Sequence, residues 1–503
     1  MADLRKSTDR AHAIESRRLF RWQRGLCLRG HSVPSRIAAA ACALLLAAGF
    51  LAPLGAPPLH AQAIDTPRAE TPAEHVILIT IDGLRPEFYM DHTWPAPMLQ
   101  RMADEGVAAD AVRGVVPTNT YPSHTTIVTG ALPARHGIAH NRPFEPGGAT
   151  GAWYVWADSI RVPALWDAAT AANRTSAGIS WPVSVGADIT WNVPEQFSVT
   201  GEEDGVTGIE ANTVALRAAV TPAGLLEEIE AAALGSFPNF YWGRNRSRED
   251  VTGAMAGYLI ETYRPNLLLV HLTQTDWHQH AFGREHPETR LSVQAVDRAI
   301  AKMVEASIRA GTLEQTAFVV TGDHGFVNMN TEINPNVWLV EAGLLEDRPD
   351  RGEWRATFHP GGGSGFLRLR DPGDTEAVDE VRRVLESQPA QIRNLFRIVE
   401  ADELAEWGAD PDSPLALAAE PGVGIGGNTS GPAVGPRSGG AHGFFPEFDQ
   451  IHTGFVAWGA GVQPASNVPI MGLEDIAPLV AALLRIPFDA PDGLLRPGIL
   501  HQP

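Results

Sequence analysis

The chain has 503 residues, of which 44% are hydrophobic and 19% are charged, so it can form one large α/β domain with an insertion or more than one compact unit. Its formal net charge of −20 excludes a general nucleic-acid-binding protein, which would present a basic face. The acidic balance does not exclude phosphate chemistry at one site, because bound cations can reverse the local electrostatic potential.

Residues 1–63 are predicted to be a signal peptide. An arginine-rich stretch precedes the apolar run IAAAACALLLAAGFLAPLGA, and the small residues of HAQA follow, so we expect cleavage after Ala63. The alternative is a membrane anchor, but the apolar run is short for a spanning helix and prolines interrupt its far end. We therefore expect a periplasmic or secreted protein with no membrane span after cleavage. Cys27 and Cys42 both lie in the leader, so the mature chain would have no disulfides.

Residues 64–75 are predicted to be a polar tether and residues 76–503 a single catalytic domain. Several apolar runs in this domain end in polar or glycine-bearing turns: HVILITIDG, TSAGISWP, PNLLLVHLTQTD, TAFVVTGDHG and TGFVAWGAG. They are rich in Val, Ile and Leu and show little alternation, which is typical of buried strands in a mainly parallel sheet.

Two stretches between these runs are predicted to be helical, PAPMLQRMADEG and ETRLSVQAVDRAIAKMVEASIRAG. The second ends at Gly311 and is expected to pack its apolar residues on the core. Those residues recur at helical spacing and are Leu291, Val296, Ile300, Met303, Val304 and Ile308. Alternating strands and helices predict an α/β fold with a doubly wound, mainly parallel sheet sandwiched by helices.

Two regions depart from this alternation. Residues about 195–262 are acidic and irregular at first and then helical. Residues about 345–435 contain a short α/β segment followed by the Gly/Pro-rich stretch EPGVGIGGNTSGPAVGPRSGG. We interpret the second region as a small inserted subdomain, with its long loop as a candidate mobile rim over the site.

Seven metal-competent side chains lie next to strand-like runs or glycine turns. They are Asp82, Thr120, Asp276, His280, Asp323, His324 and His442. Ligands of doubly wound folds gather at the carboxyl ends of strands, and all three aspartates follow strand-like runs. Three carboxylates, three imidazoles and a hydroxyl suit two borderline-soft divalent ions, and the nitrogen-rich set favours zinc over magnesium.

Thr120 is the predicted nucleophile. The stretch VVPTNTYPSHTTIVTG indicates a turn running into a helix, with Pro122 in the first helical turn. A hydroxyl there meets the positive end of the helix, which favours an approaching phosphate. The alternative is that Thr120 only caps the helix. Thr118 and Ser123 are rival hydroxyls that spacing alone does not exclude.

The two remaining histidine segments leave other questions open. In TDWHQH, Asp276 and His280 can converge on one ion in a helical turn or a tight loop, whereas His278 is a rival ligand in an extended segment. In GGAHG, His442 lies between glycines, as a close backbone approach to a ligand would need.

The chain resembles the nucleotide pyrophosphatase/phosphodiesterase branch of the alkaline phosphatase superfamily. The matching stretches run in order from Asp82 to His442: IDGLRPE, PTNTYPSHTTIVTGALPARHGIAHN, PALWDAA with SAGISWP, TDWHQH, TGDHG and GAHGF. The resemblance implies an alkaline-phosphatase-like fold and two Zn²⁺ ions. One ion would be held by Asp82, Thr120, Asp323 and His324, and the other by Asp276, His280 and His442. It also implies that Asn141 donates a hydrogen bond to a phosphoryl oxygen and that Tyr121 helps to hold the leaving group.

The chain also departs from its relatives. Gln279 stands where relatives usually carry glycine, and Ser123 where they commonly show asparagine. Nucleotide-binding relatives stack the base between two aromatic rings, and the candidates here for the second ring are Trp153, Tyr154 and Trp156. The metal site is thus more closely matched than the substrate site.

We expect an exported, metal-dependent hydrolase that cleaves phosphodiester or pyrophosphate bonds in small nucleotide-type substrates through a phosphothreonine intermediate. Phosphomonoester or phosphonate hydrolysis on the same two-metal site is the nearest alternative. Sulfatase chemistry is disfavoured, because that branch uses an oxidised cysteine or serine in its own motif and no cysteine lies outside the leader. A non-catalytic exported binding protein is a more distant alternative.

Overall fold

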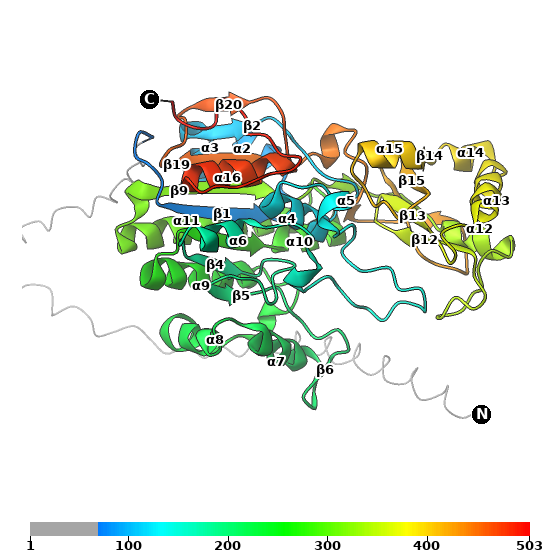
Figure 1. The fold of residues 1–503 in the computed structure, drawn as a ribbon, viewed down its shortest axis with the longest axis horizontal. Helices are drawn as coiled ribbons and strands as arrows, with labels where there is room; N and C mark the ends of the chain where they lie inside the picture. The colour runs from blue at the N-terminus through cyan, green and yellow to red at the C-terminus, as the bar shows by residue number, and fades with distance from the viewer. Residues whose placement is uncertain (1–68, 503) are drawn as a thin grey trace, which may run out of the picture. The chain divides into compact units, whose positions relative to one another are not determined.

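The five predicted strand-like runs all contribute to one eight-stranded sheet (Figure 1). The computed structural model describes residues 69–502, so the predicted signal peptide and residues 64–68 of the predicted tether lie outside the described residues. In spatial order the strands are β20 (Ser466–Val468), β2 (Val107–Ala109), β19 (Phe455–Gly459), β9 (Thr316–Gly322), β1 (His75–Ile81), β8 (Leu267–Leu272), β4 (Ser176–Ile179) and β5 (Trp191–Val193).

The sheet is mainly parallel, as the apolar runs predict. Strand β1 pairs in parallel with both β8 and β9, and β4 continues the parallel array to β5. Strand β19 is the exception, since it pairs antiparallel with β9 and β2. The carboxyl ends of β8, β1 and β9 therefore lie side by side at one edge of the sheet.

Helices cover both faces of this sheet, which makes the predicted sandwich. Val76 and Leu78 of β1 belong to the core that contains apolar residues of α4 (Thr120–Thr129), α6 (Leu165–Ala171) and α16 (Ile476–Leu484). Ile81 faces the opposite layer, which includes α3 (Pro97–Glu105) and α11 (Pro287–Ala310). Helix α9 (Ser247–Tyr263) packs along α11 in that layer. Because side chains alternate along β1, this strand contributes apolar residues to the hydrophobic cores on both faces of the sheet.

Helix α11 matches its predicted bounds, with Gly311 in the left-handed conformation at its end (φ 71°). Val296 and Ile300 are buried on its packing face, as predicted. The prediction was wrong for Leu291 and Ile308, which are 42% and 44% exposed. At about 100° per residue, Leu291 lies on the face of the helix opposite Val296 and Ile300, and Ile308 lies at the margin of the packing face. The neighbouring Ser292 and Ser307 are buried, so the helix packs along its whole length and only these two positions point away from the core.

A second, smaller sheet lies within residues 345–435 and beyond the carboxyl ends of the main strands in Figure 1. Its antiparallel strands, in spatial order, are β12 (Ala356–Pro360), β13 (Ser364–Leu369), β15 (Leu415–Ala419) and β14 (Phe396–Glu400). Helix α13 (Thr375–Glu386) contributes buried residues to the core of this sheet. The small sheet therefore has a hydrophobic core of its own.

The Gly/Pro-rich stretch forms short strands that pair with the segment following β9. Strands β16 (Val423–Ile425) and β17 (Val434–Pro436) flank β11 (Thr331–Ile333), and β18 (Gly440–Ala441) pairs with β10 (Val327–Asn328). These ladders return the chain to His442. The remaining α-helices and strands are α2 (Glu87–Met90), β3 (Val112–Arg113), α5 (Pro133–His136), β6 (Glu202–Glu203), β7 (Val206–Thr207), α7 (Ile209–Ala219), α8 (Leu225–Ile229), α10 (Gln274–Phe282), α12 (Pro335–Glu341), α14 (Ala390–Arg393), α15 (Ala401–Glu406) and β21 (Met471–Gly472).

The end of the predicted tether packs on the domain. Ala73 is buried, and the amide of Gly461 donates a hydrogen bond to the carbonyl of Ala69 (3.1 Å). Strand β1 then begins at His75. Among residues 69–502, no helix has both the length and the apolar character that crossing a membrane requires.

Gly322, at the end of β9, has no room for a side chain. A Cβ at this position would lie 2.0 Å from the Thr453 hydroxyl and 2.6 Å from Leu84 Cβ. We expect Gly322→Ala to lower the free energy of unfolding by about 1–3 kcal/mol, because overpacking forces the backbone to shift. Chemical denaturation measures the change.

The matched control is Gly257→Ala in α9, where the new Cβ would meet only Ala306 Cβ at 3.5 Å. Alanine should stabilise the helix there by about 0.5–1 kcal/mol. Equal effects of the two substitutions would contradict the packing argument.

Candidate active site

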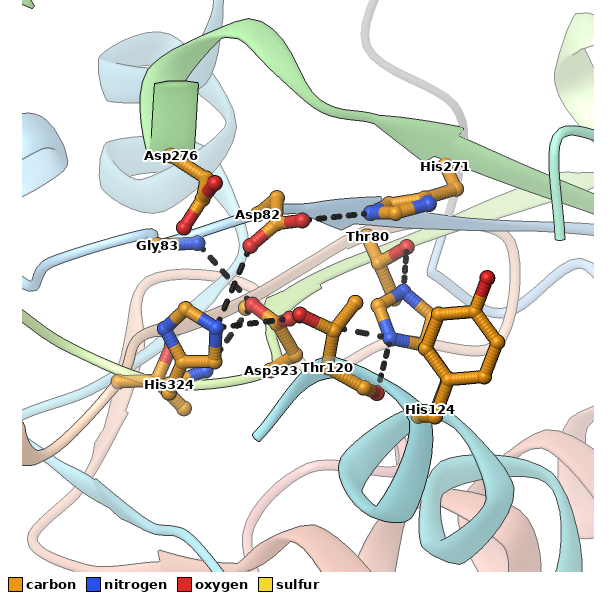
Figure 2. Close-up of polar contacts among 12 residues, drawn as sticks. Thr80, Asp82, Gly83, Thr120, His124, His271, Asp276, Asp323 and His324 are labelled. Carbon is orange, nitrogen blue, oxygen red and sulfur yellow. Dashed lines mark hydrogen bonds and ion pairs between the residues drawn. The ribbon is translucent and has the colours of Figure 1, made fainter. Parts of the chain in front are cut away.

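All seven predicted metal-competent side chains meet at the carboxyl edge of the large sheet. Asp82 directly follows β1, Asp323 directly follows β9, and Asp276 lies in the first turn of α10, just after β8. Figure 2 shows the three carboxylates and the imidazole of His324 pointing toward one another around Thr120. The parallel register of three adjacent strands brings together residues that are far apart in the sequence.

Thr120 is the hydroxyl that faces the cavity at this site. It is the first residue of α4, and the helix cap is Asn119, so capping does not account for Thr120. The rival Thr118 is buried and donates its hydroxyl to the carbonyl of Phe444 (3.0 Å). The rival Ser123 is fully buried and does not line the cavity. Of the three candidate hydroxyls, which sequence spacing does not distinguish, only that of Thr120 therefore faces the cavity.

The three histidines are oriented by main-chain carbonyls. Nδ1 of His442 lies 2.9 Å from the carbonyl of Thr118, and Nδ1 of His280 lies 2.9 Å from that of Gly440. Nδ1 of His324 lies 3.1 Å from a carbonyl in its own turn. A carbonyl only accepts, so each Nδ1 carries a proton, and in the neutral imidazole the lone pair is then on Nε2. This is the tautomer that a metal-ligating histidine needs.

The ligand atoms fall into two groups whose members all lie within 4.8 Å of one another. One group is Asp82, Asp323 and His324, and the other is Asp276, His324 and His442. His324 belongs to both, with Nε2 3.3 Å from Asp82 Oδ1 and 3.3 Å from Asp323 Oδ2. His280 joins the second group through Nε2, 3.2 Å from Asp276 Oδ1.

Four buried polar atoms at the centre of the site have no hydrogen-bond partner within the described part of the chain. They are Asp82 Oδ1, Asp276 Oδ1, Asp323 Oδ2 and His324 Nε2. Buried polar atoms are rarely left unpaired, because their desolvation is then uncompensated. Divalent cations would satisfy all four, so the donor set fits a two-metal centre.

The pKa shifts of the side chains in the site also favour bound cations. Burial, followed by the charges of Asp323 and Asp276, raises the pKa of Asp82 well above its usual value. Burial also opposes ionisation of Asp276, but the imidazoles of His280 and His442 outweigh it and lower the pKa of this carboxyl to about 2. Burial and neighbouring imidazoles hold the pKa of His442 well below its usual value. Like charges are thus concentrated where cations would neutralise them.

The helical form of the TDWHQH segment separates its two histidines. In α10, Asp276 and His280 are one turn apart and face the site together. The His278 side chain instead contacts its own helix, with Nδ1 2.7 Å from the carbonyl of Gln274. Two cavities, of about 580 and 620 Å³, adjoin the site, and His278 lines neither of them. Gln279 donates to the carbonyl of Gly83 (2.9 Å), so it braces the turn that carries Asp82.

Asn141 is poised to donate into the site. Its Oδ1 accepts the amide of Tyr121 (2.9 Å), which leaves the Nδ2 hydrogens for a ligand. Both residues line a cavity of about 580 Å³ together with Thr120. Trp153 lines the same cavity, but its ring packs on Tyr121 itself, with centroids 5.1 Å apart. Tyr154 and Trp156 do not line this cavity.

The glycine after His442 allows two backbone segments to approach each other closely. Gly443 has φ 81°, and a Cβ there would lie 1.6 Å from the carbonyl oxygen of Gly361, in the turn between β12 and β13. The sequence predicted a close backbone approach to a ligand at this point. The approach observed is between two main-chain segments.

Sequence reasoning missed two buried histidines behind the metal-ligand candidates. His271 Nε2 lies 3.2 Å from Asp82 Oδ2, and its Nδ1 lies 3.2 Å from the carbonyl of Ser180. His124 bridges the Thr80 hydroxyl and the carbonyl of Thr120, each at 2.8 Å. The one available signal was a histidine inside the apolar run LLLVHL, where a strand buried on both faces has little reason to carry it. Sequence reasoning also missed Tyr241 and Trp242, which line the far wall of the cavity.

Known proteins share both the fold and the sequence pattern. Human ectonucleotide pyrophosphatase/phosphodiesterase 5 superposes with a TM-score of 0.58 at 19% identity, covering 82% of this chain and 96% of that chain. An inactive variant of the murine protein, determined in complex with AMP, gives the same TM-score at 20% identity, with the same coverage. These matches confirm the alkaline-phosphatase-like α/β fold.

Curated relatives match in sequence over about half of this chain. An uncharacterised pyrophosphatase/phosphodiesterase of Schizosaccharomyces pombe is 26% identical over 287 residues, 56% of this chain and 50% of the relative. Human ectonucleotide pyrophosphatase/phosphodiesterase family member 7 is 24% identical over 304 residues, 59% of this chain and 55% of the relative. The chain thus spans about half the length of these relatives.

A family-level match extends further. The sequence model of the type I phosphodiesterase / nucleotide pyrophosphatase family matches residues 76–445, from the start of β1 to just beyond His442. This span contains every candidate ligand, the nucleophile candidate and the small sheet. The chain therefore belongs to the type I phosphodiesterase / nucleotide pyrophosphatase family.

Proposed function

We propose that this protein is an exported hydrolase that cleaves phosphodiester or pyrophosphate bonds in nucleotide-type substrates, with two Zn²⁺ ions and a phosphothreonine intermediate. The observation that carries the proposal is the meeting of unpaired carboxylate and imidazole atoms around a hydroxyl at a helix N-terminus. The names of the relatives support the reaction class. The export part rests on the sequence of residues 1–63.

The residues that would hold the ions follow from the two groups of ligand atoms. Asp82, Thr120, Asp323 and His324 would hold one ion, and Asp276, His280 and His442 the other. When bound, such ions make a nearby hydroxyl more acidic and neutralise charge on phosphoryl oxygens. Nitrogen ligands and the histidine tautomers support zinc over magnesium.

Thr120 would act as the nucleophile. Its Oγ forms a bond to phosphorus as the bond to the leaving oxygen breaks on the opposite side, so the phosphoryl group passes to the threonine. Water then attacks the phosphothreonine, which releases the phosphate product and restores the hydroxyl. Asn141 Nδ2 and the first amides of α4 would donate hydrogen bonds to the phosphoryl oxygens as their charge grows.

The two adjoining cavities support a substrate with a group on each side of phosphorus. One has about 580 Å³ and the other about 620 Å³, and Asn141, His280 and His442 line both. A phosphomonoester would leave one of them without a substrate group. This geometry favours diester or pyrophosphate cleavage over the phosphomonoester alternative.

Thr120→Ala should abolish turnover of bis(4-nitrophenyl) phosphate, by at least about 10³-fold in kcat, because no other hydroxyl at the start of α4 faces the cavity. Metal content and thermal unfolding should stay close to wild type. The matched control is Ser123→Ala on the same helix, whose buried hydroxyl does not line the cavity. Near-normal turnover by the Thr120 variant would remove this residue from the mechanism.

Chelation should inactivate the enzyme, and added Zn²⁺ should restore it, because one buried oxygen of each carboxylate has no hydrogen-bond partner among the described residues and is free to bind a cation. Elemental analysis of the purified protein should find two zinc ions per chain. A chain that binds no metal would support the alternative of a non-catalytic binding protein. Full activity in a metal-free preparation would refute the two-metal site.

A comparison of 4-nitrophenyl phosphate with its diester analogue should show a clear preference for the diester, expressed as kcat/KM. The physical reason is the presence of two substrate-sized cavities beside the reacting centre. Nucleotide diesters and lipid head-group diesters belong in the same panel. A preference for the monoester would favour phosphatase chemistry on the same site.

A further inference from the structure

A buried hydrogen bond joins the loop that carries Asn141 to the inserted region. His140, the residue before Asn141, is 3% exposed, and its Nε2 lies 2.9 Å from Oδ2 of Asp410. Asp410 is buried as well and lies 270 residues further along the chain, between α15 and β15. A carboxylate oxygen only accepts, so Nε2 of His140 carries the proton and donates it to Asp410.

Asp410 is held firmly within the inserted region. Arg368 of β13 forms a buried ion pair with Oδ2, and the amide of Asp412 donates a hydrogen bond to Oδ1 (3.0 Å). An ionised acceptor that is buried away from water makes a stronger hydrogen bond than a neutral one. Asp410 is therefore a fixed and strong acceptor for His140, and it keeps other partners when that donor is removed.

The orientation of the His140 ring depends on Asp410. The ring packs edge-on against His359 of β12 and Phe366 of β13, with centroids 4.6 and 4.8 Å apart. Burial, followed by the charge of Arg368, holds the pKa of His140 well below its ordinary value, so the ring is neutral. Its Nδ1 makes no hydrogen bond within residues 69–502. In that part of the chain, the contact with Asp410 is thus the ring's one hydrogen bond.

Asn141 itself is less firmly held. It is partly exposed and lines both of the cavities beside the site. Its Oδ1 accepts the amide of Tyr121 (2.9 Å), and its carbonyl accepts the amide of Tyr154 (3.3 Å). Because consecutive residues share a peptide group, fixing His140 also limits where the Asn141 backbone can lie. The Nδ2 hydrogens are then held at one place in the site.

We infer that His140 and Asp410 are positioning residues, which keep Nδ2 of Asn141 where the phosphoryl oxygens lie in the reaction. The inference rests on the proposed function, in which Asn141 donates to those oxygens. It gives the inserted region a part in the reaction, although the nucleophile and the candidate metal ligands all lie outside residues 345–435. A displacement of about 1 Å in such a group can cost about 10²-fold in rate.

His140→Phe tests the hydrogen bond, because it keeps a ring and removes the donor. In the metal-loaded enzyme, kcat for bis(4-nitrophenyl) phosphate should fall about tenfold with little change in KM, since the misplaced donor acts mainly in the transition state. His140→Gln should recover most of this loss. Its amide nitrogen lies as many bonds from Cα as Nε2 of histidine does, and it can donate to Asp410.

A double-mutant cycle shows whether His140 acts through Asn141. Asn141→Ala alone should lower kcat about 10²-fold, the usual cost of losing one such donor. In that background, His140→Phe should change kcat by no more than about twofold, because the donor that it positions is already gone. A purely structural role would instead lower kcat by the same factor in both backgrounds.

The matched control is Ser413→Ala in the same loop as Asp410. Ser413 is buried, donates its hydroxyl to the carbonyl of Leu367 (3.1 Å) and lines neither cavity. Its substitution also removes one buried hydrogen bond from the inserted region. It should lower the thermal unfolding temperature about as much as His140→Phe does, and leave kcat unchanged.

Inhibition by orthovanadate gives a second measurement, because five-coordinate vanadate resembles phosphorus during an in-line displacement. It should weaken about tenfold in His140→Phe and stay unchanged in Ser413→Ala. Unchanged kcat and vanadate inhibition in folded His140→Phe, equal loss in both backgrounds, or no recovery in folded His140→Gln would overturn the positioning role. A wild-type enzyme that hydrolyses no phosphodiester would instead contradict the proposed function.

Discussion

Mutual repulsion among three buried carboxylates is the constraint on which the site depends. Asp82, Asp276 and Asp323 are brought together by the ends of three neighbouring strands and by the helix that follows one of them. In a low-dielectric setting such a group is costly unless cations or protons neutralise it. The pKa of Asp82 shows this cost, since burial, followed by the charges of Asp323 and Asp276, raises it well above its usual value. The fold therefore places, at the sheet edge, a strong demand for positive charge.

Main-chain groups orient several of the candidate ligands. Carbonyl groups fix the tautomers of all three histidines in the site, and the amides of Gly83 and His324 both donate to Asp323 Oδ1 at 3.0 Å. One oxygen of that carboxylate is thereby held, and the other is left for a ligand. The sheet edge and the tight turns thus hold the candidate ligands in fixed orientations.

The sequence predicts those features of the fold and the site whose residues are close together in the chain. Strands β1, β8 and β9 were predicted because each is an unbroken apolar run, and their ligands follow directly in the sequence. The antiparallel direction of β19 was not predicted, because apolar composition carries no information about strand direction. His271 was missed although a histidine inside a fully buried strand is itself a signal, because only the residues after each strand were considered as ligands. The cavity of about 620 Å³ could not be predicted, since lining residues such as Arg142, Arg348 and Arg437 come together only through tertiary packing.

The contact between Gly443 and Gly361 links the small sheet to the reacting centre. Because these two main-chain segments meet with no room for even one extra carbon, the turn between β12 and β13 is in direct contact with the backbone beside His442. The insertion therefore contacts the segment that carries one of the candidate ligands. Exchange of this hairpin between relatives, or its truncation, would change the backbone support of His442 as well as the wall of the cavity that Pro360 and Gly361 line.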